Sequence, residues 1–257
     1  MNQDIAIRAF QEYTGRYDAG NVNVSLKINH TYRVAGIAGR IGRDVGADPG
    51  FSWFLGLLHD IGRFEQLRQH GTFKDAQSVD HAELGADILF SEGLIDRFSH
   101  PDIPEWEKIA EQAIRLHNKL MVPEGLDPTE LMYTHILRDA DKVDIFRVLT
   151  EPPYDERNER ILYASESLDT AQIAGEEVMQ CVREHRCVPR TSEKTEFENL
   201  ISQCCMGFEL YYPISRRITR EQGFLDRLMN LPLRNETMCG QLEILREEMK
   251  LAWETPA

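Results

Sequence analysis

The sequence predicts an all-α protein, and three observations lead to that prediction. Apolar residues recur with the 3.6-residue period of a helix in almost every long segment. Hardly any segment alternates apolar and polar residues, as a half-buried strand does. Of the 257 residues, 42% are hydrophobic and 28% are charged, an ordinary composition for a globular protein with one good-sized core. We therefore expect a compact multi-helix bundle that forms a single domain over residues 1–257.

The first long helix is expected within residues 21–46. Its apolar face includes one histidine and is formed by Leu26, His30, Val34, Ile37 and Ile41. Gly46 is expected to end the helix, because glycine readily adopts the left-handed conformation found at many helix ends. A single histidine on such a face is either a hydrogen-bonded core residue or a ligand.

The next segment, FSWFLGLLHDIGRF at residues 51–64, is expected to be a short buried helix that ends near Gly62. It places His59 and Asp60 side by side at the edge of an apolar run. A buried ionised carboxylate is costly in free energy unless something compensates its charge. A helix cap, a salt bridge or a metal ion could provide that compensation.

Two further helices each carry a histidine near one end. In SVDHAELGADILF, residues 78–90, Asp80 and Glu83 form a capping-box pattern that puts His81 in the first helical turn. In the following segment, PEWEKIAEQAIRLHNKL, the apolar stripe extends to His117. Each of these histidines could therefore face the centre of a bundle.

The last helix of this series, TELMYTHILRDADKVDIFRVLT at residues 129–150, contains Asp141. Beyond it, residues from about 155 to 257 again show helical period and predict additional C-terminal helices, one of them within 167–185. The best candidate for a division between two parts of the chain is PPYDERNER, residues 152–160, although its composition does not mark a domain boundary.

A set of polar residues occupies otherwise apolar helix faces or helix ends. Its members are His30, His59, Asp60, His81, His117 and Asp141. Helices packed in a bundle can bring such side chains together at one point. Four imidazoles and two carboxylates suit iron, manganese or nickel, with zinc or magnesium as alternatives. Two metal ions that share one carboxylate would use the whole set, and Asp60 would be the natural bridge.

The order of these residues resembles that of a known family. His30, the His59-Asp60 doublet and Asp141 in RDADKVD are similar to the H…HD…D motif of the HD-domain superfamily of metal-dependent phosphohydrolases. The resemblance covers residues from about 25 to 150, and the phrases LLHDIGRF and DADKVD resemble the family closely. It implies an HD-domain bundle in which these four residues hold a first metal ion. It also implies that His81 and His117 hold a second ion that shares Asp60.

Several alternatives stay open within this resemblance. The segment after His117, NKLMVPEG, lacks the GYP element of the cyclic-di-GMP phosphodiesterase branch, so the sequence does not favour that substrate. The same six residues also resemble the ligand set of mixed-valent di-iron oxygenases built on the HD fold. A third alternative is a degenerate HD fold that serves as a regulatory binding module, although a complete ligand set argues against it.

Three cationic residues near the motif are candidates for binding a substrate phosphate. Arg63 follows Asp60 by three positions, and a guanidinium there could bind phosphate through two hydrogen bonds. Lys142 and Arg138, which lie close to Asp141 in the sequence, are further candidates. We expect Asp60 and Arg63 to take part in catalysis, Asp60 by orienting the attacking water and Arg63 by neutralising the phosphate.

The expected function is hydrolysis of a phosphate ester, with a nucleotide or a small phosphorylated metabolite as substrate and a metal-activated water as nucleophile. The net charge of −14 argues against a general nucleic-acid or membrane surface. Neither a signal peptide nor a membrane span is visible, and five cysteines without a CxxC pair suit a reducing cytoplasm. The sequence leaves the oligomeric state and the substrate open.

Overall fold

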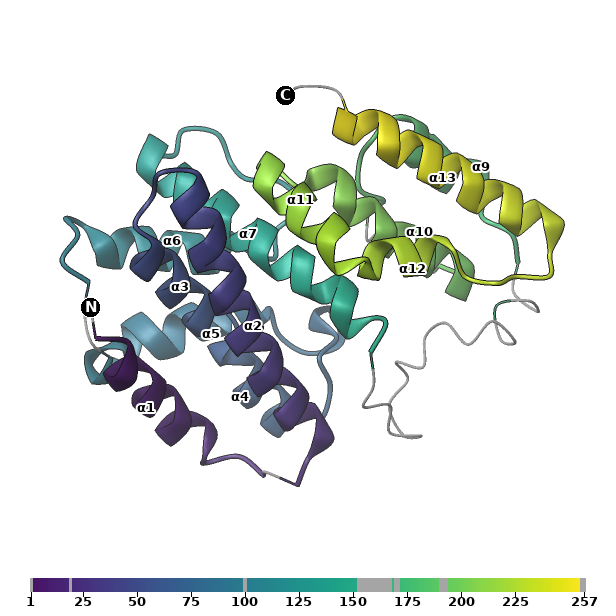
Figure 1. The fold of residues 1–257 in the computed structure, drawn as a ribbon. Helices are drawn as coiled ribbons and strands as arrows, with labels where there is room; N and C mark the ends of the chain where they lie inside the picture. Colours follow the sequence, from purple (N-terminus) through teal and green to yellow (C-terminus); the bar gives the residue numbers. More distant parts are fainter. Residues whose placement is uncertain are drawn as a thin grey trace. The chain divides into compact units, whose positions relative to one another are not determined.

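The computed structural model describes residues 2–18, 20–98, 101–151, 168, 172–189 and 194–254. Within these residues every regular element is a helix and no strand is present, so the prediction of an all-α fold is confirmed (Figure 1). The chain divides into two compact units, Met1–Asp144 and Ile145–Ala257. This division does not test whether the chain is one domain, and the single-domain expectation stays a prediction.

The first unit contains all six residues of the expected metal site. Its main helices are α1 (Gln3–Thr14), α2 (Val22–Asp44), α3 (Pro49–Leu58), α4 (Ile61–His70), α5 (His81–Ala86), α6 (Trp106–Leu116) and most of α7 (Pro128–Val148). α2 packs along α3, while α5 packs against both α4 and α6. Fully buried aromatic rings fill the space between them, among them Phe10, Phe51, Phe54 and Phe64.

Two helix ends lie where the sequence predicts them. α2 ends at Asp44, and Gly46 follows with φ of 78°, in the left-handed region that favours glycine. α5 begins after Asp80, whose carboxylate accepts hydrogen bonds from the backbone N–H groups of Ala82 and Glu83. The Glu83 side chain does not complete the capping box and instead forms an ion pair with Arg115.

The expected helix end near Gly62 is wrong. α3 already ends at Leu58, and a new helix, α4, starts at Ile61 and runs to His70. Gly62 lies in the first turn of α4, where a Cβ atom would come within 2.2 Å of the His81 carbonyl oxygen. The absence of a side chain at Gly62 therefore allows α4 and α5 to approach closely, and it does not end a helix.

α1 is a helix that the sequence analysis does not identify. Asn2 caps its N-terminus by accepting hydrogen bonds from the N–H groups of Asp4 and Ile5. Its buried face includes Phe10 and Tyr13, and the Tyr13 hydroxyl donates a hydrogen bond to the carbonyl oxygen of Ile61. This contact ties α1 to the start of α4, directly after the His59-Asp60 doublet.

The second unit consists of further helices, as the sequence predicts for the C-terminal part. They are α9 (Glu176–Arg183), α10 (Glu196–Cys204), α11 (Pro213–Gln222), α12 (Phe224–Met229) and α13 (Glu236–Glu254). α13 packs against α9 and α12. The candidate boundary segment, residues 152–160, lies outside the described residues. So does the start of the helix expected within 167–185.

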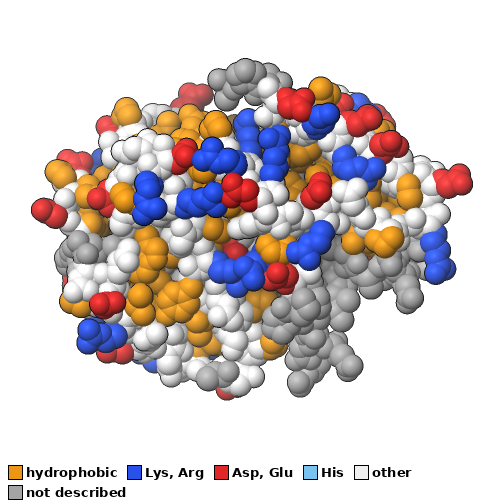
Figure 2. All heavy atoms as spheres, viewed as in Figure 1, with side chains coloured by type: hydrophobic (Ala, Val, Ile, Leu, Met, Phe, Trp, Pro, Cys, Tyr) orange, Lys and Arg blue, Asp and Glu red, His pale blue; other side chains and the backbone are white. Residues whose placement is uncertain are grey.

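The surface carries charges of both signs. On the face drawn in Figure 2, basic, acidic and hydrophobic side chains are interspersed. None of the helices in the described ranges combines the length and the apolar character needed to cross a membrane.

Candidate metal centre

The six residues expected to bind metal come from separate elements of the first unit. His30 lies in the middle of α2, while His59 and Asp60 occupy the short break between α3 and α4. His81 is the first residue of α5, and His117 directly follows α6. The sixth residue, Asp141, lies in α7. The four imidazoles and Asp60 are each less than 5% exposed, and Asp141 is 14% exposed, so the cluster is almost entirely buried.

Two of the imidazoles are oriented by backbone carbonyls. His59 Nδ1 donates to the carbonyl oxygen of Gly56 at 2.8 Å, and His117 Nδ1 donates to that of Ile114 at 2.7 Å. A carbonyl oxygen only accepts, so each Nδ1 must carry the hydrogen. In the neutral ring, Nε2 is therefore a lone-pair donor that can bind a metal ion.

The other two imidazoles are oriented by carboxylates. His30 Nδ1 lies 2.6 Å from Asp144 Oδ2, and His81 Nδ1 lies 2.7 Å from Asp75 Oδ2. Arg33 in turn holds Asp144 through two hydrogen bonds. Such carboxylate partners fix the ring orientation and make Nε2 a stronger ligand. In all four histidines, therefore, Nδ1 is hydrogen-bonded to an oxygen and Nε2 faces the cluster as the atom that could bind a metal ion.

Three of the four Nε2 atoms lie close to an aspartate oxygen, and His117 groups with His59 and Asp60. Asp60 Oδ2 lies 3.6 Å from His30 Nε2 and 3.4 Å from His59 Nε2. The other oxygen of Asp60, Oδ1, lies 3.6 Å from His81 Nε2. Asp141 Oδ1 is 3.1 Å from His30 Nε2 and 3.6 Å from His59 Nε2. The two oxygens of Asp60 therefore face different histidines, as a bridging carboxylate requires.

Two features of the cluster fit a bound cation. His59 Nε2 is buried and has no hydrogen-bond partner among the residues that the structure describes. His81 Nε2 and His117 Nε2 lie 3.0 Å apart, which brings two lone pairs together when both rings are neutral. Buried polar atoms rarely lack partners, and facing lone pairs need a proton or a cation between them. The donor set of imidazole nitrogens and carboxylate oxygens suits a divalent transition metal.

The electrostatics differ between the histidines of the cluster, because only some of them lie beside the carboxylates. Burial lowers the pKa of His59, but the nearby Asp60 and Asp141 carboxylates outweigh it and raise that pKa to about 10. Burial, together with His81 and His59, lowers the pKa of His117 to about 3. His117 is therefore neutral at neutral pH, which is the protonation state that binds a metal ion.

The structure adds three residues to those expected from the sequence. Asp144 and Asp75 orient His30 and His81, as described above. The third is Lys27, whose ammonium lies 2.6 Å from Asp60 Oδ2 while its side chain is only 12% exposed. Together with Arg63 and His59, Lys27 holds the pKa of the buried Asp60 carboxyl well below its usual value, although burial alone would raise it.

Arg63 lies beside the cluster, and its proposed role in catalysis stays a prediction. Its Nε is 3.6 Å from Asp60 Oδ1, and its Nη1 donates to Asp75 Oδ1 at 2.8 Å and to the Phe73 carbonyl oxygen at 2.6 Å. The buried side chain of Gln66 also binds both Arg63 and Asp75. Arg63 therefore helps to position Asp75, the partner of His81, in addition to its position next to Asp60.

The other two cationic candidates lie in different surroundings. The Arg138 guanidinium is buried and donates to the backbone carbonyl of Leu116, the last residue of α6, and to those of Lys119 and Leu120 in the segment that follows. It thus stabilises the segment that carries His117. Lys142 is also buried and directly follows Asp141 on α7, and neighbouring residues on a helix do not face each other. Substrate binding by Arg138 and Lys142 stays a prediction.

The cluster and its scaffold define a class of protein: an all-α fold whose buried histidines and aspartates could hold a metal ion. Comparison with family models is more specific. Residues 28–146 match the HD domain, a family of mostly metal-dependent hydrolases, and the match includes all six residues. The match confirms the resemblance of residues 28–146 to the HD-domain superfamily. Comparisons with curated proteins and with solved structures found no match.

Proposed function

We propose that the protein is a metal-dependent phosphohydrolase that acts on a nucleotide or a small phosphorylated metabolite. The observation that supports this most is the cluster of four imidazoles around Asp60 and Asp141, with Lys27 and Arg63 beside Asp60. A site with ligands for cations and two nearby cationic side chains is suited to a phosphate ester.

In this proposal each metal ion has its own ligands and Asp60 serves both. His30, His59, Asp60 and Asp141 would hold the first ion, and His81 and His117 would hold the second together with Asp60. Support comes from the Asp60 carboxylate, whose Oδ2 faces His30 and His59 while its Oδ1 faces His81. Divalent ions held by these residues would polarise a phosphoryl oxygen and lower the pKa of a bound water.

The side chains of the chain itself would bind and orient the reactants. The Asp60 carboxylate can accept a hydrogen bond from the attacking water and so direct its lone pair toward phosphorus. Lys27 and Arg63 can donate hydrogen bonds to the phosphate oxygens and offset the negative charge that grows in the transition state. Lys27 adds a compact charge, whereas the planar guanidinium of Arg63 adds directional hydrogen bonds.

The first prediction separates hydrolysis from the alternative of a di-iron oxygenase, which would use the same six ligands. Protein loaded with manganese or iron should release inorganic phosphate from at least one member of a panel of phosphorylated metabolites under strictly anaerobic conditions. Phosphate release is measured with and without oxygen, and with and without added metal. Product formation that requires both oxygen and reduced iron would instead support the oxygenase. A filled metal site with no turnover of any kind would support the regulatory binding module.

A further inference from the structure

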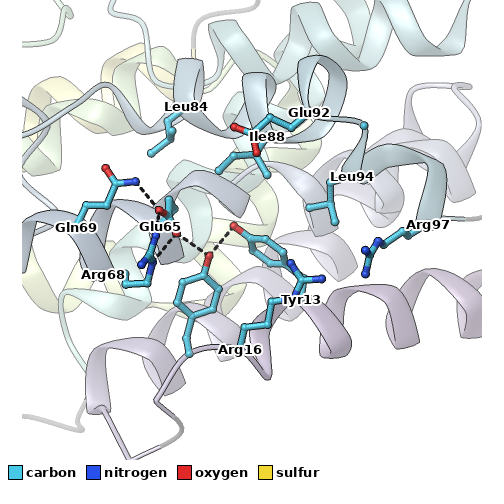
Figure 3. Close-up of a pocket in the computed structure, with 12 residues that line it drawn as sticks. Tyr13, Arg16, Glu65, Arg68, Gln69, Leu84, Ile88, Glu92, Leu94 and Arg97 are labelled. Atoms are coloured by element: carbon cyan, nitrogen blue, oxygen red, sulfur yellow. Dashed lines mark hydrogen bonds and ion pairs between the residues drawn. The ribbon is translucent and has the colours of Figure 1, made fainter.

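The first unit contains a cavity that none of the candidate metal ligands lines. It has a volume of about 410 Å³ and is lined by residues of α1, α4, α5 and the two short helical segments that follow α5, Asp87–Ser91 and Leu94–Arg97 (Figure 3). Cavities of this size are typical of sites for small molecules.

Two arginine side chains face each other across this cavity. Arg16, just beyond α1, and Arg97, at the end of its helical segment, point their guanidinium groups toward one another (Figure 3). In the ranges that the structure describes, neither guanidinium forms an ion pair or a hydrogen bond. The Arg16 guanidinium lies 5.8 Å from the centre of the Tyr13 ring. Two like charges that point at each other repel, and an anion between them would turn that repulsion into attraction.

The acidic residues of the cavity do not neutralise this pair. Glu65 is already held by Arg68, Gln69 and Tyr17 through hydrogen bonds. The carboxylate of Glu92 lies on the side of Ile88, away from Arg97 (Figure 3). The positive charge of Arg16 and Arg97 is therefore uncompensated inside the cavity, although the chain as a whole carries a net charge of −14.

We propose that this cavity is a second anion site and that it binds the phosphate group of a small phosphorylated molecule between Arg16 and Arg97. A tetrahedral phosphate dianion can accept hydrogen bonds from two guanidinium groups on opposite sides, which a planar carboxylate does less well. The cavity volume leaves room for an organic part of the ligand next to the apolar side chains of Leu84, Ile88 and Leu94.

The site does not share residues with the proposed hydrolytic site, because none of the six candidate metal ligands, and neither Lys27 nor Arg63, lines the cavity. Tyr13 is the nearest connection, since its hydroxyl donates to the carbonyl oxygen of Ile61, the residue after Asp60. Phosphate binding in this cavity should therefore not require a metal ion.

The test uses inorganic phosphate as the probe and titration calorimetry as the measurement. The protein is titrated both with bound metal and after chelation, and the variant is Arg16→Gln combined with Arg97→Gln. Both side chains are exposed, so the variant should fold, and its circular dichroism and thermal unfolding are compared with those of the unchanged protein. The matched control is Arg8→Gln, which removes an exposed arginine of α1 that does not line the cavity.

We expect saturable phosphate binding that persists after chelation and weakens by at least about tenfold in the double variant, the loss typical of one charge-assisted hydrogen bond. Arg8→Gln should bind phosphate as the unchanged protein does. Unchanged affinity in the folded double variant, or binding that disappears on chelation, would overturn the proposal. Tighter binding of succinate than of phosphate would overturn the assignment of the ligand class.

Discussion

Replacement of Asp60 by Ala is expected to remove both metal ions and all measurable hydrolysis. Asp60 is the residue whose two oxygens face the two groups of histidines, so its loss takes a ligand from each ion at once. The substitution also leaves the Lys27 ammonium without its carboxylate partner beside the cluster, where it repels cations. Metal content is measured by elemental analysis, and phosphate release is measured on the same samples.

Asp48→Asn is the matched control for this substitution. Asp48 also lies in the first unit and caps α3, a role that Asn performs equally well. The control should keep its metal and its activity. If Asp60→Ala retained about two ions per chain, the assignment of Asp60 as the bridging ligand of a two-metal site would be wrong.

Replacement of Lys27 by Met is expected to lower kcat/KM by about tenfold to a hundredfold while metal content stays unchanged. In the proposed function the ammonium would donate a charge-assisted hydrogen bond to the substrate phosphate, and such a bond is worth about 1.5–3 kcal/mol. Lys27 is not a metal ligand, and its ammonium competes with a metal ion for Asp60 Oδ2, so its removal should not weaken metal binding. Steady-state kinetics and elemental analysis together separate these two effects.

The control for Lys27→Met is Lys250→Met, in which the replaced side chain is 72% exposed and lies in the second unit. This variant should behave as the unchanged protein. Lys27→Arg should recover part of the activity because it restores the charge in a different shape. Full activity in Lys27→Met would mean that the phosphate is bound by other residues, with Arg63 the first to test.

Much of the candidate site can be predicted from the sequence because its ligands interrupt apolar patterns. His30 stands out on a hydrophobic stripe, and His59 and Asp60 stand out at the end of a buried run. Lys27 and Asp144 could have been found from their spacing to the expected ligands. Each lies three residues from an expected ligand on the same helix, a spacing that places both side chains on one face.

Other features depend on packing between elements and leave no periodic signal. Asp75 reaches His81 from the segment between α4 and α5, where the sequence shows no regular pattern. The role of Gly62 depends on how closely α4 approaches α5, which the sequence does not reveal. From the sequence alone, a glycine at this position therefore predicts a helix end. Arg138 lies one turn from Asp141, yet its guanidinium is turned toward the segment after α6, a direction that spacing alone does not determine.

The most direct test of the two-metal site is elemental analysis of the native protein beside His81→Ala, with His70→Ala as the control. His81 is a candidate ligand of the second ion only, whereas His70 is an exposed histidine at the end of α4. We predict about two divalent ions per chain in the native protein and in the control, falling toward one in His81→Ala. A native content near zero, with no uptake of added manganese or iron, would contradict the account.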